Sequence, residues 1–294
     1  MRLNTPTRRR GGRRRRLTAT LGRLLRNRLA LAGFVISVAV VLMVLLAPEI
    51  APYPPDAIDY RAMLAAPGAT HLLGADDLGR DVLSRAMIGG RLSLAVSLVS
   101  VLIAVTVGVP LGLIAGYLGG FVDEVLMRVI DSIIALPPLV LALTITAVLG
   151  PGLINAMFAI AVVAVPGFTR LTRGQVLSLK HSDYVMAARS VGVRPSLLVL
   201  RHILPNVLNP IIVQAALGVG FAMITESSVS FIGLGAQPPT ATWGSMVQVG
   251  FQYLETAPWM ALAPAALIFL AVLGFNMLGE GLRGALDPAT RATA

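Results

Sequence analysis

The sequence predicts an all-α integral membrane protein with six transmembrane helices. Three observations predict this class: 56% of the 294 residues are hydrophobic, only 13% are charged, and the mean hydropathy is +0.80. An ordinary soluble domain carries about 25% charged residues. A backbone inside hydrocarbon must satisfy its own hydrogen bonds, so long apolar stretches that cross it must be helices. A water-soluble enzyme of this length is therefore nearly excluded.

Six apolar stretches approach or exceed the length of about 20 residues that one crossing requires. They cover residues 29–47, 92–115, 129–149, 152–168, 207–226 and 259–279. The first stretch exceeds the apolar core of a signal peptide, which has about 7–15 residues, and Ala47-Pro48-Glu49 lacks a small-residue cleavage site. We therefore expect the first stretch to remain as a membrane anchor.

Basic residues predict the orientation of the chain, because they concentrate on the cytoplasmic side of a membrane. Eleven of the 24 Lys and Arg residues precede Leu29. With a cytoplasmic N-terminus, the inner segments hold 20 of the 24 and the outer segments hold four. We expect both termini in the cytoplasm, with the basic tail at anionic lipid head groups rather than on nucleic acid. The expected parts are a basic cytoplasmic tail (1–28), the first span plus an outer segment (29–91), a transmembrane core (92–284) with a cytoplasmic loop (169–206), and a cytoplasmic C-terminal tail (285–294).

Small residues in the second stretch predict close helix contacts. Gly108, Gly112 and Gly116 recur at a spacing of four residues, which lets two helix backbones approach each other closely. The spacing favours packing within the chain, and pairing with another membrane subunit is the second interpretation.

Two polar segments lie on the expected outer side. Residues 48–91 are rich in Pro and Asp and contain a polar block from His71 to Asp81. Residues 227–258 carry no basic residue, and the part from Ser227 to Pro239 is too polar for lipid yet apolar enough to lie against helices. This pattern favours a short re-entrant or cavity-lining element.

The sequence lacks the motifs of a motor or an enzyme. An ATP-driven motor needs a G-x-x-x-x-G-K-[ST] loop whose lysine reaches the phosphates, and the single lysine, Lys180, stands between Leu179 and His181. The three histidines lie outside the six stretches, no H-E-x-x-H occurs, and there is no cysteine. We therefore predict no catalytic residue, no metal ligand and no cofactor bound by this chain.

Acidic residues within or beside a span are functional candidates, because a charge there is costly. Asp131 and Glu226 qualify, and Ser230 is a further candidate for the same cavity or gate. Each acid lies near the end of a predicted span, where a carboxylate reaches water or a helix terminus, so a structural role competes with lining a cavity. A membrane aspartic protease would need two acids deep in facing helices, and Asp131 is the only aspartate in a span.

The inner loop, residues 169–206, begins with the pattern of a short helix. Ser182 is placed to N-cap a helix from Asp183 to Val191. Gly192 is placed to end that helix in a left-handed conformation. We therefore expect a helix of about two turns between two spans.

A second short helix is predicted directly after the first. Pro195 suits its first position, and Leu197, Leu200 and Leu204 share one face before Pro205 stops the helix. A helix pair with such an apolar face requires a cover. The cover is either the chain's own bundle or a groove on a separate protein.

The loop resembles the EAA loop of bacterial ABC importer permeases. The stretch from Asp183 to Gly192 resembles E-A-A-x-x-x-G, and the stretch from Arg201 to Asn206 resembles an ending with H-x-L-P. Met186 departs from the pattern, because the family usually has glutamate there. The resemblance implies that two cytoplasmic ATPases move this loop and switch a cavity between outward and inward access. The implied coupling residues are Asp183, Met186, Ala187, Ala188, Gly192, His202, Pro205 and Asn206.

Four further segments resemble the dipeptide, oligopeptide and nickel branch of these importers. They are residues 71–84, 226–239, 243–244 and 281–288. The resemblance implies six transmembrane helices of the type I ABC importer permease kind, located in the bacterial cytoplasmic membrane. It implies short peptides as the cargo and leaves nickel chelates, haem and glutathione-like ligands open.

The resemblance also implies partners. They are a second homologous permease subunit, two cytoplasmic ABC ATPase subunits or domains that hold ATP and Mg, and an extracytoplasmic substrate-binding protein, in a lipid membrane and without nucleic acid. Two other classes compete with this interpretation. An ion-coupled secondary carrier would need intramembrane acids arranged in repeats, and no convincing repeat is present. A membrane-embedded hydrolase would need a nucleophile or metal constellation, and none is recognisable.

Overall fold

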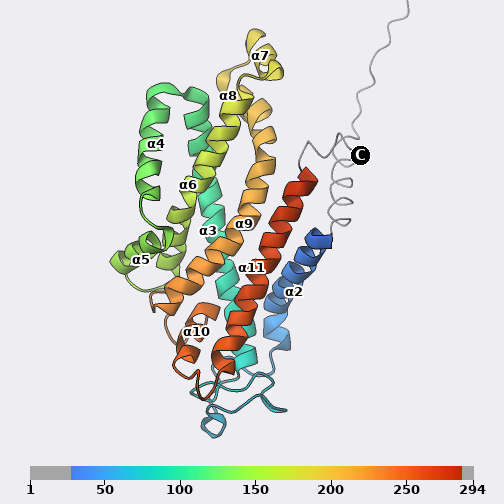
Figure 1. The fold of residues 1–294 in the computed structure, drawn as a ribbon, viewed down its shortest axis with the longest axis vertical. Coiled ribbons are helices and arrows are strands. Elements are labelled where there is room, and N and C mark those ends of the chain that lie inside the picture. The colour runs from blue at the N-terminus through green and yellow to red at the C-terminus, as the bar shows by residue number, and fades with distance from the viewer. Residues whose placement is uncertain (1–27, 287–294) are drawn as a thin grey trace, which may run out of the picture.

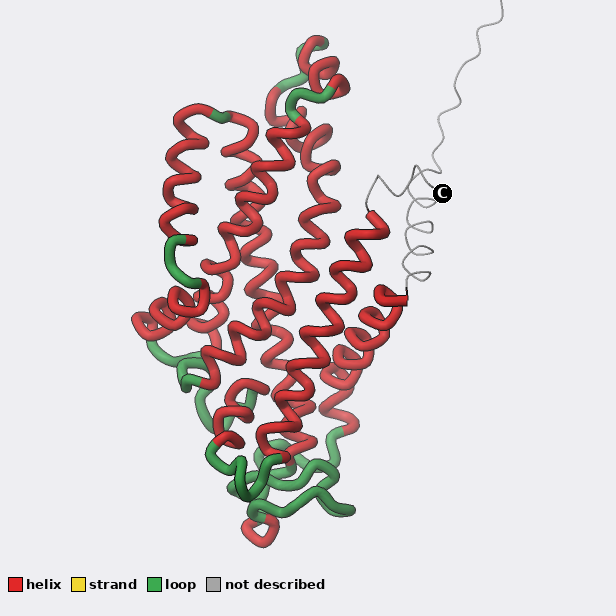
Figure 2. The backbone as a smooth tube through the Cα atoms, viewed as in Figure 1, coloured by secondary structure: helices red, strands yellow, loops and turns green. Residues whose placement is uncertain are grey.

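A computed structural model describes residues 28–286, which are almost entirely helical and contain no β-strand. The helices are α2 (Arg28–Ile50), α3 (Val82–Leu118), α4 (Gly120–Ile134), α5 (Pro138–Leu149), α6 (Leu153–Leu179), α7 (Asp183–Ser190), α8 (Pro195–Leu198), α9 (Leu204–Phe231), α10 (Trp243–Phe251) and α11 (Trp259–Leu286). The long helices lie side by side, with α7 and α8 at one end (Figure 1). Most loops gather at the opposite end (Figure 2). The expected tails, 1–28 and 285–294, fall outside the described residues except for residues 28, 285 and 286.

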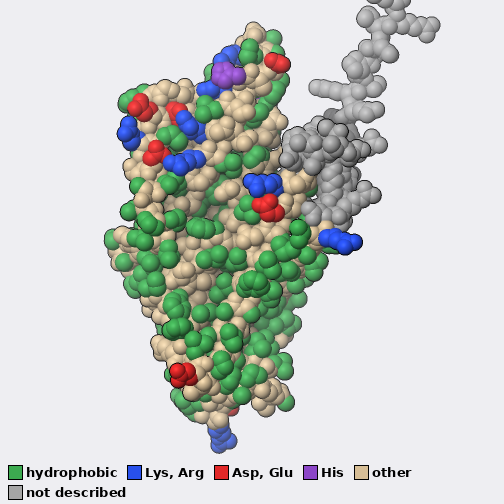
Figure 3. All heavy atoms as spheres, in the orientation of Figure 1, with side chains coloured by type: hydrophobic (Ala, Val, Ile, Leu, Met, Phe, Trp, Pro, Cys, Tyr) green, Lys and Arg blue, Asp and Glu red, His purple; other side chains and the backbone are tan. Residues whose placement is uncertain are grey.

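Five helices within residues 28–286 are long and apolar enough to cross a membrane: α2, α3, α6, the continuous helix Pro195–Phe231, and α11. A sixth crossing is present if the bent pair of α4 and α5 counts as one. The all-α membrane class expected from composition is therefore confirmed. On the face in Figure 3, charged side chains gather near α7 and α4, and the flank of the bundle is broadly hydrophobic.

The third predicted span, residues 129–149, is wrong as a single straight helix. The chain forms α4 and α5, which are bent by 88° at the break between them. The dipeptide Pro137-Pro138 explains the bend. Pro137 is extended, with φ −54° and ψ 132°, because a residue that precedes proline is pushed out of the helical region. Pro138 then starts α5, at a position where its missing N–H is not needed.

Helix α3 lies at the centre of the bundle and approaches α6 very closely. Gly108, Gly112 and Gly116 all face α6, and a Cβ on Gly112 would lie 2.5 Å from the Thr169 carbonyl oxygen. The glycine spacing thus serves packing within the chain, which is the first of the two interpretations above. The close approach makes α3 and α6 a rigid pair.

The inner loop differs from expectation at Pro205, which does not stop the second short helix. Helix α8 continues through a π-helical turn, Val199–Ile203, into α9, so Pro195–Phe231 is one 37-residue helix. The π turn accommodates the proline, because Leu204 donates its N–H to the Val199 carbonyl, five residues back. The loop is therefore a direct extension of the fifth predicted span.

The segment between α2 and α3 folds into a cap over the end of the bundle opposite α7. Asp81 N-caps α3, since its Oδ2 accepts the Ser84 N–H at 2.7 Å, and its Oδ1 lies 2.9 Å from His71 Nδ1. The ring of Tyr53 lies 5.0 Å from that of His71. The polar block noted in the sequence is thus a local structural motif that fixes the start of α3.

Candidate functional site

Helix α7 begins at Asp183, as the sequence predicts. Gly192 follows it with φ +78°, in the left-handed region, and a Cβ there would meet no atom within 4 Å. The expected side-chain cap is wrong, because Ser182 makes no cap hydrogen bond to α7. Its hydroxyl donates instead to the Leu179 carbonyl at 2.6 Å. The bend at Gly192 therefore depends on backbone conformation and not on side-chain packing.

The inner loop has a buried side and an exposed side. On the buried side, Val185, Leu198 and Ile203 belong to the main hydrophobic core. Five large apolar side chains of the loop remain exposed, and we call this set the exposed loop face: Tyr184, Met186, Val191, Leu197 and Leu200. Met186 is 53% exposed and Val191 is 79% exposed. The bundle thus covers only part of the apolar surface of the loop.

The remaining loop residues singled out in the sequence surround this face. Asp183, Ala187, Pro205 and Asn206 are exposed, whereas Ala188 and His202 are half-buried. Asn206 donates through Nδ2 to the His202 carbonyl at 2.7 Å and to the Tyr184 hydroxyl at 3.3 Å. The hydrogen bond to Tyr184 links the start of α9 to α7, so it connects the two halves of the loop.

Glu226 lies inside the bundle near the end of α9 and is 0% exposed. Ser230, one turn later, donates through Oγ to Glu226 Oε1 at 2.8 Å. The hydroxyls of Ser93, Ser227 and Thr242 also face this carboxyl group. In this conformation Glu226 and Ser230 line no open cavity. The geometry favours the structural interpretation, in which a buried carboxyl group lies between α3, α9 and the start of α10 and bonds to Ser230.

Helix α10 is fixed to both α3 and α9 beside this carboxyl group. The Trp243 backbone N–H donates to Ser93 Oγ at 3.0 Å, and its indole N–H donates to the Ala86 carbonyl at 2.7 Å. A Cβ on Gly244 would lie 2.7 Å from the Ser227 Cα. The short element expected from Ser227 to Pro239 is not a separate helix, because this stretch forms the end of α9 and the loop that follows it. The short helix α10 begins later, at Trp243, and is anchored to both α3 and α9.

Asp131 lies on α4, apart from the Glu226 cluster. Its Oδ1 accepts a hydrogen bond from Arg170 Nη2 at 2.5 Å, and both side chains are about half exposed. A second pair joins Asp123 to Arg173 through two hydrogen bonds of 2.5 and 2.6 Å. Sequence reasoning missed these pairs because it placed both arginines in the inner loop, whereas α6 continues through them. The usable signal was spacing. The two aspartates, Asp123 and Asp131, are eight residues apart and the two arginines are three apart, so each pair lies on one face of its helix.

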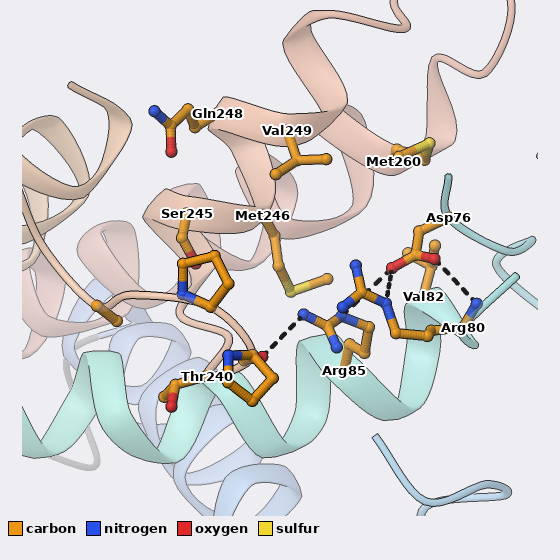
Figure 4. A pocket seen from close by; sticks show the side chains of 13 residues that line it. Asp76, Arg80, Val82, Arg85, Thr240, Ser245, Met246, Gln248, Val249 and Met260 are labelled. Atoms are coloured by element: carbon orange, nitrogen blue, oxygen red, sulfur yellow. Dashed lines mark hydrogen bonds and ion pairs between the residues drawn. The ribbon is translucent and has the colours of Figure 1, made fainter. Parts of the chain in front are cut away.

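A small cavity of about 90 Å³ lies between the start of α3, α10 and the loop before α10 (Figure 4). Asp76 Oδ2 accepts from Arg80 Nε at 2.7 Å and lies 3.5 Å from Arg85 Nε. Arg85 also donates to Asp56 at 2.8 Å and to the Pro239 carbonyl at 3.5 Å. These charged groups pair with one another within the chain. The cavity therefore lies at a packing contact between the outer segment and this loop. Within residues 28–286, no three His, Asp or Glu side chains form a group that could hold a metal ion.

Two family models match the chain. Residues 108–292 match the binding-protein-dependent transport system inner membrane component, and residues 18–67 match the N-terminal TM domain of oligopeptide transport permease C. The first match covers more than half of the chain. The chain belongs to the family of binding-protein-dependent transport system inner membrane components.

Relatives of this permease agree with that membership. It is 43% identical over 269 residues to the dipeptide transport system permease protein DppC of Alkalihalophilus pseudofirmus, covering 92% of this chain and 88% of the relative. It is 48% identical over 270 residues to DppC of Escherichia coli, covering 90% of each. The glutathione transport system permease protein GsiD of Pectobacterium atrosepticum is 40% identical over 271 residues, which are 92% of this chain and 90% of GsiD.

A solved structure shows the same fold. A chain of the inward-facing MetNI methionine ABC transporter matches with a TM-score of 0.57 at 19% identity, covering 69% of the permease and 97% of that chain. The predicted type I ABC importer permease fold is therefore confirmed. As a multi-span permease of this family, the chain is a transport subunit of an inner membrane.

Replacing Glu226 tests the buried carboxyl group of the permease. We expect Glu226→Ala to lower stability by about 2–5 kcal/mol, because it leaves a cavity and deprives the buried Ser230 hydroxyl of its partner. Glu226→Gln keeps the shape and an acceptor oxygen for Ser230, so we expect it to remain close to wild type. Thermal unfolding of the purified protein in detergent measures both effects.

The matched control is Glu255→Ala, which removes an exposed carboxylate near the same end of the bundle. It should leave the unfolding temperature unchanged. A Glu226→Ala protein as stable as this control would show that the carboxyl group does not hold α10 in place.

Proposed function

We propose that this chain is the transmembrane permease subunit of an ATP-driven importer that moves short peptides across the cytoplasmic membrane by alternating access. The observation that carries the proposal is the 43–48% identity to dipeptide permeases over about nine-tenths of the chain. The exposed loop face supports it independently, because an apolar helix pair at the end of a bundle needs a partner groove.

The geometry suggests how this chain carries the movement. Helices α8 and α9 form one helix from the loop to the Glu226 cluster, and Gly192 ends the preceding helix with a sharp bend. A partner that displaces α7 and α8 therefore displaces α9 directly. Through the contacts at Glu226 and Gly244, that displacement reaches α10 at the other end of the bundle. The coupling role falls to the exposed loop face and to the residues implied by the EAA resemblance. Glu226 and Ser230 are the candidate gate because they lie where this movement reaches α10, whereas Asp131 pairs with Arg170 apart from them.

The proposed complex contains a second homologous permease, two ABC ATPase subunits or domains that hold ATP and Mg, and an external binding protein. In the proposed topology both termini and the loop with α7 lie in the cytoplasm, and the cap between α2 and α3 lies outside. The chain itself binds no cofactor and hydrolyses no ATP. The four parts are the basic tail (1–28), the first span and cap (29–91), the permease core (92–284) and the C-terminal tail (285–294).

Uptake in vesicles tests this function. The complex, purified with its co-expressed partners and reconstituted with the binding protein, should accumulate labelled dipeptide only when ATP is present on the loop side. A proton gradient without ATP should drive no uptake. Accumulation driven by the gradient alone would replace the proposal with an ion-coupled secondary carrier.

The proposed topology gives a separate prediction. The chain has no cysteine, so single cysteines introduced at Arg61, Ser190 and Gln252, all exposed, can be labelled in intact cells without background. We expect a membrane-impermeant maleimide to label the variants at positions 61 and 252 and to spare the variant at position 190. Permeabilised cells, in which all three should react, provide the control. Labelling of position 190 in intact cells would invert the proposed orientation.

A further inference from the structure

An apolar groove of about 350 Å³ opens between the last turns of α3 and the start of the helix that contains α8. It is lined by Pro110, Leu113, Ile114, Tyr117, Leu118, Pro195, Ser196, Val199 and Leu200. Tyr117 and Ser196 contribute the only hydroxyl groups of this lining. The volume falls within the range of about 300–1,000 Å³ that is typical of ligand sites. Leu200 is shared between this lining and the exposed loop face, and none of the candidate gate residues lines the groove.

The depth of the groove in the membrane follows from α3. The apolar stretch expected to cross hydrocarbon in α3 ends near residue 115, and the lining runs from Pro110 to Leu118. At 1.5 Å per residue this segment is about 12 Å long. The groove therefore extends across the boundary between hydrocarbon and head groups. It continues into an exposed apolar surface of α3 that includes Leu102 and Val107.

Three basic residues lie near the end of the groove that contains Tyr117 and Pro195. The Arg189 guanidinium carbon lies 6.0 Å from the centre of the Tyr117 ring, and Arg194 directly precedes the lining residue Pro195. Lys180 donates to the Gly116 carbonyl at 3.2 Å, next to the same turn of α3. Among residues 28–286, no carboxylate lies within 4.0 Å of Arg189 or Arg194.

We propose that this groove binds an anionic phospholipid of the cytoplasmic leaflet, with an acyl chain against α3 and the phosphate near Arg189 and Arg194. The inference takes from the proposed function only the orientation that places α7 in the cytoplasm. An apolar groove that faces hydrocarbon at one end and has two arginines without a carboxylate partner near the other end matches an amphiphile with a negative head group. A protein segment in the same place would have to supply both an apolar stripe and an acid aligned with the two arginines.

Such a lipid would contact α3 and the coupling loop at the same time. Val199 belongs to the π-helical turn between α8 and α9, and Leu200 belongs to the exposed loop face. The lipid therefore braces the loop against the rigid pair of α3 and α6. Uptake should depend on anionic lipid in the loop-side leaflet.

Lipid retention tests the proposal directly. The full chain, either alone or in complex with its partners, is reconstituted in nanodiscs of equimolar phosphatidylglycerol and phosphatidylcholine and purified from them. Native mass spectrometry then measures the lipids that the protein retains. We expect enrichment of phosphatidylglycerol in both preparations. In the Arg189→Gln/Arg194→Gln variant, the enrichment of phosphatidylglycerol should fall about fivefold for each arginine removed. This fall corresponds to about 1 kcal/mol for each arginine. Arg283→Gln, an exposed arginine near the end of α11, should retain the wild-type enrichment.

A second variant examines the apolar part of the groove. Ile114→Trp adds bulk to the exposed side of α3, so it should reduce retention of both lipids while the protein stays monodisperse. Enrichment that is unchanged in the double arginine variant, or equally reduced by Arg283→Gln, overturns the proposal. Enrichment that disappears in the complex also overturns it and assigns the groove to a partner subunit. These readouts require no transport, so they decide the lipid site even if the proposed function fails.

Discussion

Substituting valine for Gly192 is expected to abolish most ATP-coupled uptake while leaving the membrane bundle intact. The backbone at this position has φ +78°, where a β-branched residue is a conformational outlier. Holding valine in that conformation costs about 1–3 kcal/mol, which corresponds to a shift of about 5–150-fold in the population of the native loop. The substituted Cβ itself meets no atom within 4 Å, so the effect arises from the bend and from the partner surface. Peptide-stimulated ATP hydrolysis by the reconstituted complex measures this loss of coupling.

Two control variants separate backbone conformation from side-chain size. Gly192→Asn places a larger side chain at the same position, but asparagine tolerates the left-handed region, so we expect it to retain most of the activity. Gly174→Val adds valine to a helical glycine of α6 that also has no neighbour within 4 Å, and uptake should persist. If Gly192→Val assembled and transported normally, the loop would be ordinary packing at the end of the bundle.

Composition was sufficient to predict the class of the protein, and the lengths of the apolar stretches predicted the positions of most spans. Hydrocarbon imposes one requirement on every spanning segment, namely about 20 apolar residues in a helix, and that requirement is visible in the sequence. The exception, the bend between α4 and α5, follows from Pro137-Pro138, a local signal that a search for apolar length does not use. At Pro205 the sequence predicted a helix end that is absent, because a π-helical turn before the proline allows the helix to continue.

The candidate site was predicted less completely, for a physical reason. Glu226 was found from the cost of a charge in a span, but its surroundings were not. Ser93 and Thr242, which face the carboxyl group, are distant in sequence or lie beyond a loop, and single hydroxyls in apolar helices carry no pattern. The Arg170–Asp131 pair depended on knowing that α6 continues beyond its apolar stretch. The left-handed bend at Gly192 was predictable, because local backbone geometry selects the residue type.

The largest effect on folding is expected from Gly112→Leu. Gly112 lies where α3 and α6 are closest, and a Cβ there would stand 2.5 Å from the Thr169 carbonyl oxygen and 2.6 Å from the Thr172 Cβ. Both neighbours belong to the middle of a helix, so neither can move without displacing α6. Overpacking typically costs about 1–3 kcal/mol, and we expect the upper end here because the contacts are with the backbone and the Cβ of a helix. We expect little monodisperse protein in mild detergent and a large fall in the unfolding temperature of what remains.

The same contact makes the expected loss specific to position 112. Thr106→Leu introduces the same side chain six residues earlier on α3, at an exposed position, and the variant should fold as well as wild type. Gly112→Ala adds only the Cβ, so its cost should lie between those two variants and report how far α6 can yield. A stable, monodisperse Gly112→Leu protein would mean that α3 and α6 are not held at this distance, and the loop at their ends would lose the rigid support on which coupled movement depends.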